Sequence, residues 1–220
     1  MSLYVTGLEI GTVTWASDPI AGGVIPQRCL ERAGWGQEQV EKSPERIPEK
    51  LWRTLVADRG PTGDVPTYYQ RACEYCLKNR TENGHINTKE LLKSKDFMFK
   101  TNKEAVSQQS IFQDYLERVQ AVTWNRSFLQ ASPREDGKTT PHGTKMEDLL
   151  GLGPPETQIS DVVAILYGCS VPYILRPKMQ YPESNSSSQG YESIDEAYIY
   201  GKMEGEARDD THVEKKFRLM

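Results

Sequence analysis

The strongest signal in the pattern of hydrophobic and polar positions is DVVAILYGCSVPYILRP, residues 161–177, the most apolar stretch of the chain. Its β-branched and aromatic side chains favour a pleated sheet, and the small residues at 168–170 suit a tight turn between two strands. Because Pro172 has no N–H to donate, the second strand either begins there or lies at a sheet edge. A membrane-spanning helix would need roughly 20 apolar residues. The pattern therefore predicts a hairpin in the core, with buried side chains at Val163, Ile165, Leu166 and Ile174.

Alternating apolar and polar positions predict further strands near both ends of the chain. In residues 3–15, Leu8 and Ile10 share one parity and Val13 and Trp15 share the other, which is typical of a strand with a glycine bulge at Gly11. We predict a strand or a hairpin there. Residues 191–200 alternate in the same way. We expect the latter strand to form a long hairpin with the strand before it, and the N- and C-terminal strands to meet in one sheet.

Apolar residues at helical spacing predict three amphipathic helices near 49–58, 66–78 and 109–123, and a short helix is expected near 29–33. Polar, turn-rich composition marks 79–108, 131–149 and 178–190, which we predict to be flexible loops; the first of them has weak order or carries a loosely docked helix.

The fold class expected from these elements is α+β. A small antiparallel β-sheet packs against about three amphipathic helices in a single domain at 1–207, followed by a charged tail at 208–220 that frays. The segment GLGPP at 151–155 superficially suggests a phosphate loop, but it precedes a strand and two of its residues are prolines without a donor. We therefore predict a turn there.

Two cysteines, Cys73 and Cys76, form a C-x-x-C motif within the second predicted helix. A zinc site needs four ligands, and no second pair follows at a suitable spacing. Both cysteines fall on the apolar stripe of the helix, where cysteine behaves as a small hydrophobe. We predict that they pack in the core, and no metal or cofactor is expected.

Composition narrows the class of partner and the compartment. The net charge of -4 and the pI near 5.5 argue against nucleic acid as a partner. The N-terminus has no basic segment followed by an apolar one, so we expect neither export nor membrane insertion, and a cytoplasmic location.

No catalytic set is predicted. The chain lacks a G-x-S-x-G motif, and its three histidines lie in polar segments without an evident partner. Charged residues instead gather at the ends of predicted elements, where ion pairs between elements are the expected role and contact with a ligand is the alternative. These residues are Arg53, Asp58, Arg59, Asp161, Arg176 and Glu196.

Several of these segments resemble a known group of proteins. The blocks LWRTLVADRG, VTWNRSFL, GLGPPETQISDVVAILYGCSVPYILRP and YESIDEAYIYGKMEGEA are similar, in order and approximate spacing, to the signature blocks of the region that follows the HET domain in fungal heterokaryon-incompatibility proteins. The opening LYVTGLEIGTVTWAS is similar to the strand that begins this region. The last block departs from the family pattern at Asp195, where the family has Gly, and at Tyr200, where it has His.

The resemblance implies a non-catalytic regulatory or interaction module of self/non-self recognition and programmed cell death. HET-domain or other fungal incompatibility proteins would be its partners, and no catalytic residue is implied. A HET domain with a TIR-like fold normally comes first in that family and this chain begins after it, so we expect a domain-lost paralogue, a truncated gene product or an isolated module. The alternative is a small-ligand-binding or enzymatic domain whose site is assembled from the dispersed polar residues.

Overall fold

The computed structural model describes residues 2–36, 47–60, 62–64, 66–94, 103–134, 147–178, 189–203, 205–206 and 214–220, without the side chains of 103–110. The chain divides into two compact units. Met1–Asp18 and Ser127–Met220 form one of them, here called the sheet unit, and Pro19–Arg126 form the other, here called the helical unit. The helical unit is thus inserted in the sequence between two segments of the sheet unit.

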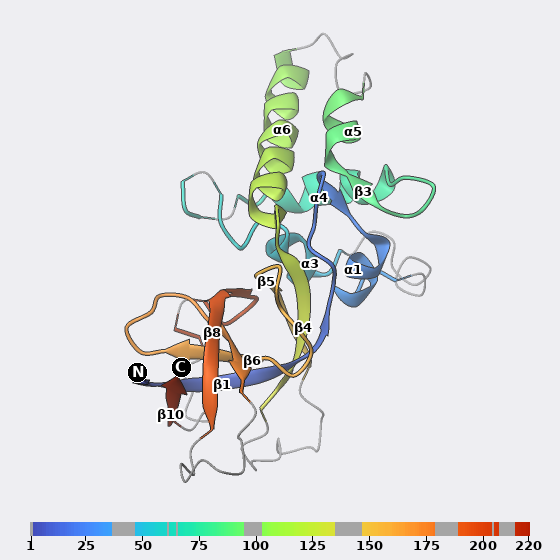
Figure 1. The fold of residues 1–220 in the computed structure, drawn as a ribbon. Coiled ribbons are helices and arrows are strands. Elements are labelled where there is room, and N and C mark those ends of the chain that lie inside the picture. The colour runs from blue at the N-terminus through green and yellow to red at the C-terminus, as the bar shows by residue number, and fades with distance from the viewer. Residues whose placement is uncertain are drawn as a thin grey trace, which may run out of the picture. The chain divides into compact units, whose positions relative to one another are not determined.

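The sheet unit contains an eight-stranded sheet (Figure 1). Its strands, in chain order, are β1 (Leu3–Ala16), β4 (Ser127–Pro133), β5 (Leu149–Gly153), β6 (Val162–Leu166), β7 (Tyr173–Pro177), β8 (Gly190–Glu196), β9 (Tyr198–Ile199) and β10 (Glu214–Leu219). Their order in the sheet is β10-β8-β7-β6-β1-β4-β5-β9, with an additional pairing between β10 and β1. All of these pairings are antiparallel except the one between β10 and β8.

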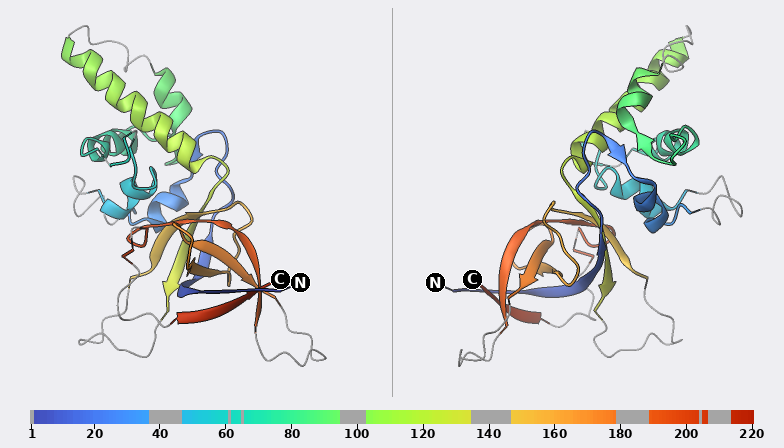
Figure 2. Two further views of the ribbon diagram at one scale, coloured as in Figure 1. Left: turned by 90° about the vertical axis from the view of Figure 1, so that its left-hand side faces the viewer. Right: turned by 45° about the vertical axis from the view of Figure 1, so that its right-hand side comes forward.

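The long strand β1 allows the sheet to close on itself twice. Along one edge it pairs with β10 from Leu3 to Leu8 and with β4 from Gly11 to Ala16. The first closure runs through β1, β6, β7, β8 and β10. In the second, β8 continues through Ala197 into β9, which pairs with β5, and β5 pairs with β4. Figure 2 shows the resulting curl of the strands and the two chain ends side by side.

Each closure surrounds its own hydrophobic cluster. Val163 and Ile174 belong to a cluster with residues of β1, β4 and β9, whereas Val162, Ala164 and Leu175 belong to a second cluster with Tyr191 of β8 and Phe217 of β10. Strand β6 is therefore covered on both faces, which explains why its sequence VVAIL is continuously apolar and does not alternate.

The helical unit is built from five helices and a two-stranded sheet in its described residues. The helices are α1 (Gln27–Arg32), α3 (Glu49–Thr54), α4 (Tyr69–Lys78), α5 (Thr88–Lys93) and α6 (Lys103–Thr123), and the strands are β2 (Val24–Ile25) and β3 (Ile86–Asn87). The buried hydroxyl of Thr88 donates to the carbonyl of Gly23 at 2.8 Å and accepts from the amide of Gln120 at 2.8 Å. This one side chain therefore links α5, α6 and the turn before β2.

The chain passes from one unit to the other twice, after Asp18 and after Arg126, and hydrogen bonds within each unit join the residues that flank these two positions. In the sheet unit the N–H of Ser17 donates to the carbonyl of Phe128 at 2.9 Å, and the N–H of Phe128 donates to the Ser17 hydroxyl at 3.0 Å. In the helical unit the N–H of Ile20 donates to the carbonyl of Arg126 at 2.9 Å. The chain therefore leaves and re-enters each unit at adjacent positions.

The α+β class is confirmed, but the prediction of a small, wholly antiparallel sheet is wrong, because the sheet has eight strands and one parallel pairing. The strands at 3–15 and 191–200 and the hairpin at 161–176 are present as β1, β8 with β9, and β6 with β7. Strand β7 begins directly after Pro172 and is flanked by β6 and β8, so it is not an edge strand. Three of the four predicted core side chains are buried, and Ile165 is partly exposed.

The three predicted helices are present as α3, α4 and α6, with bounds that differ by several residues. The predicted turn at GLGPP is wrong, because residues 151–153 lie in β5 and a turn follows at Pro155. The tail does not fray throughout, since its residues 214–219 form β10. The described parts of the predicted loops include α5, the start of α6 and the end of β4, and residues 95–102, 135–146 and 179–188 lie outside the described residues.

Candidate functional site

Asp161 and Arg176, which bracket the apolar hairpin in the sequence, form an ion pair in the sheet unit. The Asp161 side chain is 2% exposed and accepts two hydrogen bonds from the guanidinium of Arg176, both at 2.9 Å. It also accepts from the N–H of Gln158 at 2.8 Å, while Arg176 donates to the carbonyl of Glu156 at 2.5 Å. Hydrogen bonding to Asp161 raises the pKa of Arg176, although partial burial acts to lower it. The pair therefore fastens the turn before β6 onto β7.

Arg53 and Asp58 form a second ion pair at the end of α3 in the helical unit. Arg53 donates to Asp58 at 2.5 Å and to Glu49 at 2.7 Å. Burial lowers the pKa of Arg53, but the hydrogen bonds to the two carboxylates outweigh this effect and raise it. Asp58 has a left-handed backbone (φ 54°), which aspartate tolerates better than most residues, and its N–H donates to the carbonyl of Arg53 at 2.9 Å. The carbonyl of Arg59 accepts from the guanidinium of Arg118 at 3.0 Å.

Glu196, the last of the predicted polar residues, lies exposed at the end of β8. Its carboxylate accepts from the hydroxyl of Tyr173 at 3.4 Å, across the pairing of β7 with β8. Desolvation raises the pKa of Tyr173, and the neighbouring Cys169 and Glu196 add to the effect. The structure thus brings together Arg53 with Asp58 and Asp161 with Arg176, each pair within one unit, and it brings Glu196 to neither pair.

Sequence reasoning missed a third charged cluster, centred on Glu9 of β1. Its carboxylate contacts the ammonium of Lys215 at 2.5 Å and the guanidinium of Arg134 at 2.9 Å. Lys215 also contacts the Tyr191 hydroxyl at 2.8 Å and lies over the rings of Tyr191 and Phe217. One carboxylate therefore links β1 to β10 and to the residue after β4. The available signal was Glu9 as the one acid of the predicted strand at 3–15, but its main partner lies in the segment predicted to fray.

The two cysteines of the C-x-x-C motif are buried in the helical unit, as predicted. Burial raises the pKa of the Cys73 thiol to about 12 and raises that of Cys76 well above its usual value. Tyr115 of α6 is fully buried beside them, and desolvation also raises the pKa of its hydroxyl. Its ring meets the Tyr69 ring edge-on at 5.2 Å. Buried neutral thiols of this kind are weak nucleophiles and poor metal ligands.

A cavity of about 280 Å³ lies in the sheet unit at the turn between β6 and β7. The end of β6 and the turn at 167–172 form one side of it, and Lys202, Met203 and Gly205 contribute from the segment after β9. Its lining contains none of the six predicted polar residues. Lys202 is the one charged side chain in that lining among the residues described.

In the part of the chain that the structure describes, neither a metal-ligand cluster nor a membrane-spanning helix is found. Those residues contain no cluster of three or more histidine, cysteine or acidic side chains placed to hold a metal ion. They also include no helix with the length and apolar character needed to cross a membrane.

The twice-closed sheet, with an internal hydrophobic cluster at each closure, places the sheet unit in the class of small closed β-domains. Residues 35–220 match the family model of the Het-6 beta-barrel domain. The chain therefore belongs to this family, which is related to fungal heterokaryon incompatibility. No curated protein and no solved structure matches the chain.

Proposed function

We propose that the chain is a non-catalytic interaction module of fungal self/non-self recognition, acting in the cytoplasm on HET-domain or other incompatibility proteins. Family membership supplies the fungal incompatibility context. The resemblance of its blocks to the region that follows a HET domain supplies the finer proposal that the chain acts through such a partner.

The observation that carries the non-catalytic part of the proposal is how the polar candidates are used. Asp161 and Arg176 fasten a turn to a strand, Arg53 and Asp58 close a helix end, and Glu196 meets a tyrosine hydroxyl across two strands. Acid/base catalysis requires titratable groups that converge on a substrate cavity with suitably shifted pKa values. These residues instead form separate contacts of the kind that hold elements together, and none of them lines the cavity at the β6–β7 turn.

The proposal is tested by expressing the tagged full chain in a fungus that carries HET-domain proteins. Capture of a HET-domain protein and a change in growth or cell death on co-expression are the expected results. The matched negative control is Ile174→Asp, which places a charge in a fully buried position and should abolish both readouts by unfolding the sheet unit. Absence of both a partner and a growth effect with the folded chain contradicts the proposal.

A second variant separates interaction from catalysis. Glu196→Gln keeps the size of an exposed side chain and removes its acid/base capacity. A binding module should retain both partner capture and the growth effect with this change. Retained capture with a lost growth effect would indicate chemistry at Glu196 and would favour the enzymatic alternative.

A further inference from the structure

The cavity at the β6–β7 turn has an apolar floor that the two hydrophobic clusters supply. Leu8 belongs to one cluster and Leu166 to the other, and both are 4% exposed. The partly buried Ile165, which pairs with Leu8 across β1 and β6 and directly precedes Leu166, also lines the cavity. Val171 and Met203 add further apolar surface from the two turns. A concave apolar surface of this size approaches the lower limit of about 300 Å³ for small-molecule pockets.

The turn that carries Lys202 is held in place by the end of β9. The N–H of Lys202 donates to the carbonyl of Ile199 at 3.1 Å, and the Met203 sulfur accepts from the N–H of Ile199 at 3.5 Å. Gly201 supports the turn with a left-handed backbone, φ 69°. Lys202 therefore lines the cavity from a turn whose backbone is hydrogen-bonded to the end of β9.

The charges around the cavity favour an anion. Within the described part of the chain the Lys202 ammonium has neither an ion pair nor a side-chain hydrogen bond, and no acidic side chain belongs to the lining. Two acids bond to lining residues from outside the lining, and both carboxylates are already engaged: Glu214 accepts from the hydroxyl of Tyr167 at 2.5 Å, and Glu206 accepts from the N–H of Met203 at 3.3 Å. A ligand that enters the cavity thus meets apolar surface below and one available cation at the side.

We propose that this cavity binds a small amphipathic anion, a carboxylate with a short apolar body whose charge pairs with Lys202. The apolar body displaces water from the surface formed by Leu8, Ile165 and Leu166, which provides the hydrophobic part of the affinity. The carboxylate accepts a charge-assisted hydrogen bond from the ammonium, which provides selectivity over neutral molecules of the same shape. This binding does not depend on the interaction with incompatibility proteins proposed above.

The test is isothermal titration calorimetry of the full chain with octanoate and with octanol, a neutral molecule of similar body. Octanoate should bind saturably at one molecule per chain and more tightly than octanol. Lys202→Met keeps the length and apolar body of the side chain while removing its charge. It should weaken octanoate binding by at least roughly tenfold, the size expected for loss of a charged hydrogen bond, and leave octanol binding unchanged.

Two more variants make the result specific to the cavity. Val171→Trp places a large ring in the lining and should abolish binding of both molecules, while thermal unfolding shows whether the variant is still folded. Lys89→Met, an exposed lysine of α5 in the helical unit, is the matched control and should bind like the parent chain. Equal affinity for octanoate and octanol, no binding of octanoate, unchanged affinity in Lys202→Met, or unchanged affinity in folded Val171→Trp would each overturn the proposal.

Discussion

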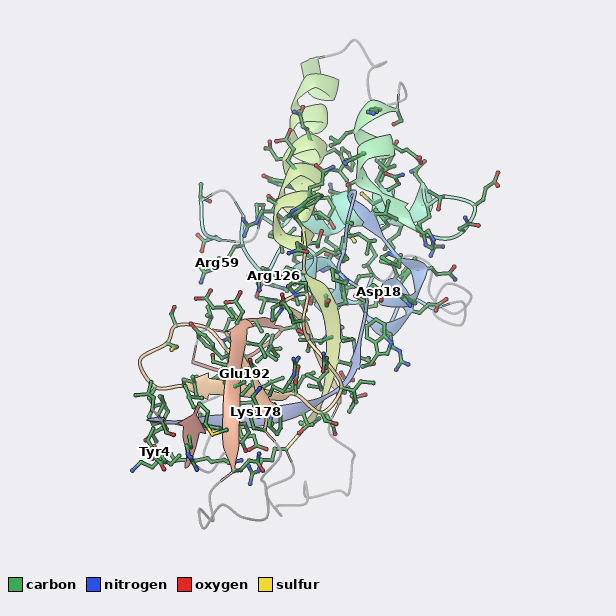
Figure 3. All side chains as sticks on the ribbon, in the orientation of Figure 1. Tyr4, Asp18, Arg59, Arg126, Lys178 and Glu192 are labelled. Atoms are coloured by element: carbon green, nitrogen blue, oxygen red, sulfur yellow. The ribbon has the colours of Figure 1, made fainter. Side chains whose placement is uncertain are left out.

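The contribution of an ion pair to the stability of this protein depends on how deeply the pair is buried. Two pairs illustrate this, one made by Arg176 of β7 and one made by Lys178 directly after β7. Asp161 is 2% exposed and Arg176 is 23% exposed, whereas Lys178 and Glu192 are exposed by 41% and 43%. Figure 3 shows Lys178 and Glu192 next to each other on the surface of the sheet unit. Removing one partner of a buried pair leaves an uncompensated charge, whereas water readily replaces an exposed partner.

We therefore predict that Arg176→Met lowers the free energy of unfolding by about 2–4 kcal/mol, because Asp161 would remain buried with only a backbone donor. Lys178→Met, the matched exposed control, should cost less than about 0.5 kcal/mol. Urea denaturation of both variants measures the difference. Equal costs for the two substitutions would contradict the structural role assigned to Asp161.

The buried thiols of α4, Cys73 and Cys76, should make the free energy of unfolding decrease at alkaline pH. Unfolded thiols ionise near their usual pKa of 9.0, but the folded Cys73 thiol has a pKa raised to about 12 and that of Cys76 is raised well above 9.0. Above pH 9.0 the unfolded chain therefore binds fewer protons than the folded chain, and the free energy of unfolding falls as pH rises through this window.

Between about pH 7.5 and about pH 9.5 each buried thiol should remove about 1 kcal/mol of stability. Cys73→Ala should lose one such contribution, so its stability falls less steeply over the same interval than that of the parent chain. Urea denaturation at the two pH values provides the measurement. Cys169→Ala, at an exposed cysteine, serves as the control and should keep the pH dependence of the parent.

At the scale of elements, β6 and β7 form the region of the sheet on which both closures depend. Ile174 is fully buried in one cluster, whereas Ile165 is only partly buried beside it. Ile174→Ala should therefore cost about 2–4 kcal/mol, the range for a buried large-to-small change, and Ile165→Ala should cost clearly less. Chemical denaturation tests the order, and a larger cost at Ile165 would contradict the difference in burial between these two side chains.

Gly151 permits the pairing of β5 with β9. A Cβ atom at this position would lie 2.2 Å from the carbonyl oxygen of Tyr198, which is backbone and cannot move away alone. Gly151→Ala should therefore cost more than about 2 kcal/mol and open this pairing, as seen by increased hydrogen exchange at Tyr200, whose N–H donates to the carbonyl of Leu150 at 2.9 Å. The control is Gly36→Ala, where nothing lies within 4 Å of the added carbon, and it should be neutral or slightly stabilising.

The elements that sequence reasoning found are those whose pattern is local. The hairpin of β6 and β7 has dense β-branched residues on both sides of a glycine turn, and the amphipathic stripe of α4 repeats every three to four residues. Strand β5 was missed because LLGLG carries two glycines, and the reason for Gly151 is a backbone 47 positions away, at Tyr198. No local pattern contains that information.

The contacts of the charged residues follow the same rule: those between residues near each other in the sequence could be predicted, and those between distant residues could not. Asp161 and Arg176 flank one hairpin and Arg53 and Asp58 end one helix, so their sequence positions already suggested contact. The partners Glu9 and Lys215 are joined only by the pairing of the first strand with the last. The cavity could not be predicted either, because it combines the β6–β7 turn with a turn after β9.

At the scale of the whole chain, the last strand completes the first closure of the sheet. Phe217 is fully buried in the cluster that this closure surrounds, while its neighbour Lys216 is exposed. Phe217→Asp should release β10 and raise hydrogen exchange on the β1 segment from Leu3 to Leu8. The segment of β1 from Gly11 to Ala16 pairs with β4 and should stay protected.

Lys216→Asp is the matched control for this experiment and should leave exchange along β1 close to that of the parent chain. A uniform loss of protection along the whole of β1 in Phe217→Asp would show that the two closures are not separable. Exchange measured by mass spectrometry on peptides from β1 resolves the two cases.

The antiparallel pairing of β1 with β10 sets Leu3 opposite Leu219, so the beginning and end of the described chain meet at one corner of the sheet. A mechanical force applied to the two ends would act across the strands at this corner, and the residue pairs would separate in succession from Leu3 towards Leu8. Unzipping of this kind yields at low force, because only one pair bears the load at a time. The sheet unit is therefore expected to be mechanically weak along the line that joins its ends, however firmly its two clusters are packed.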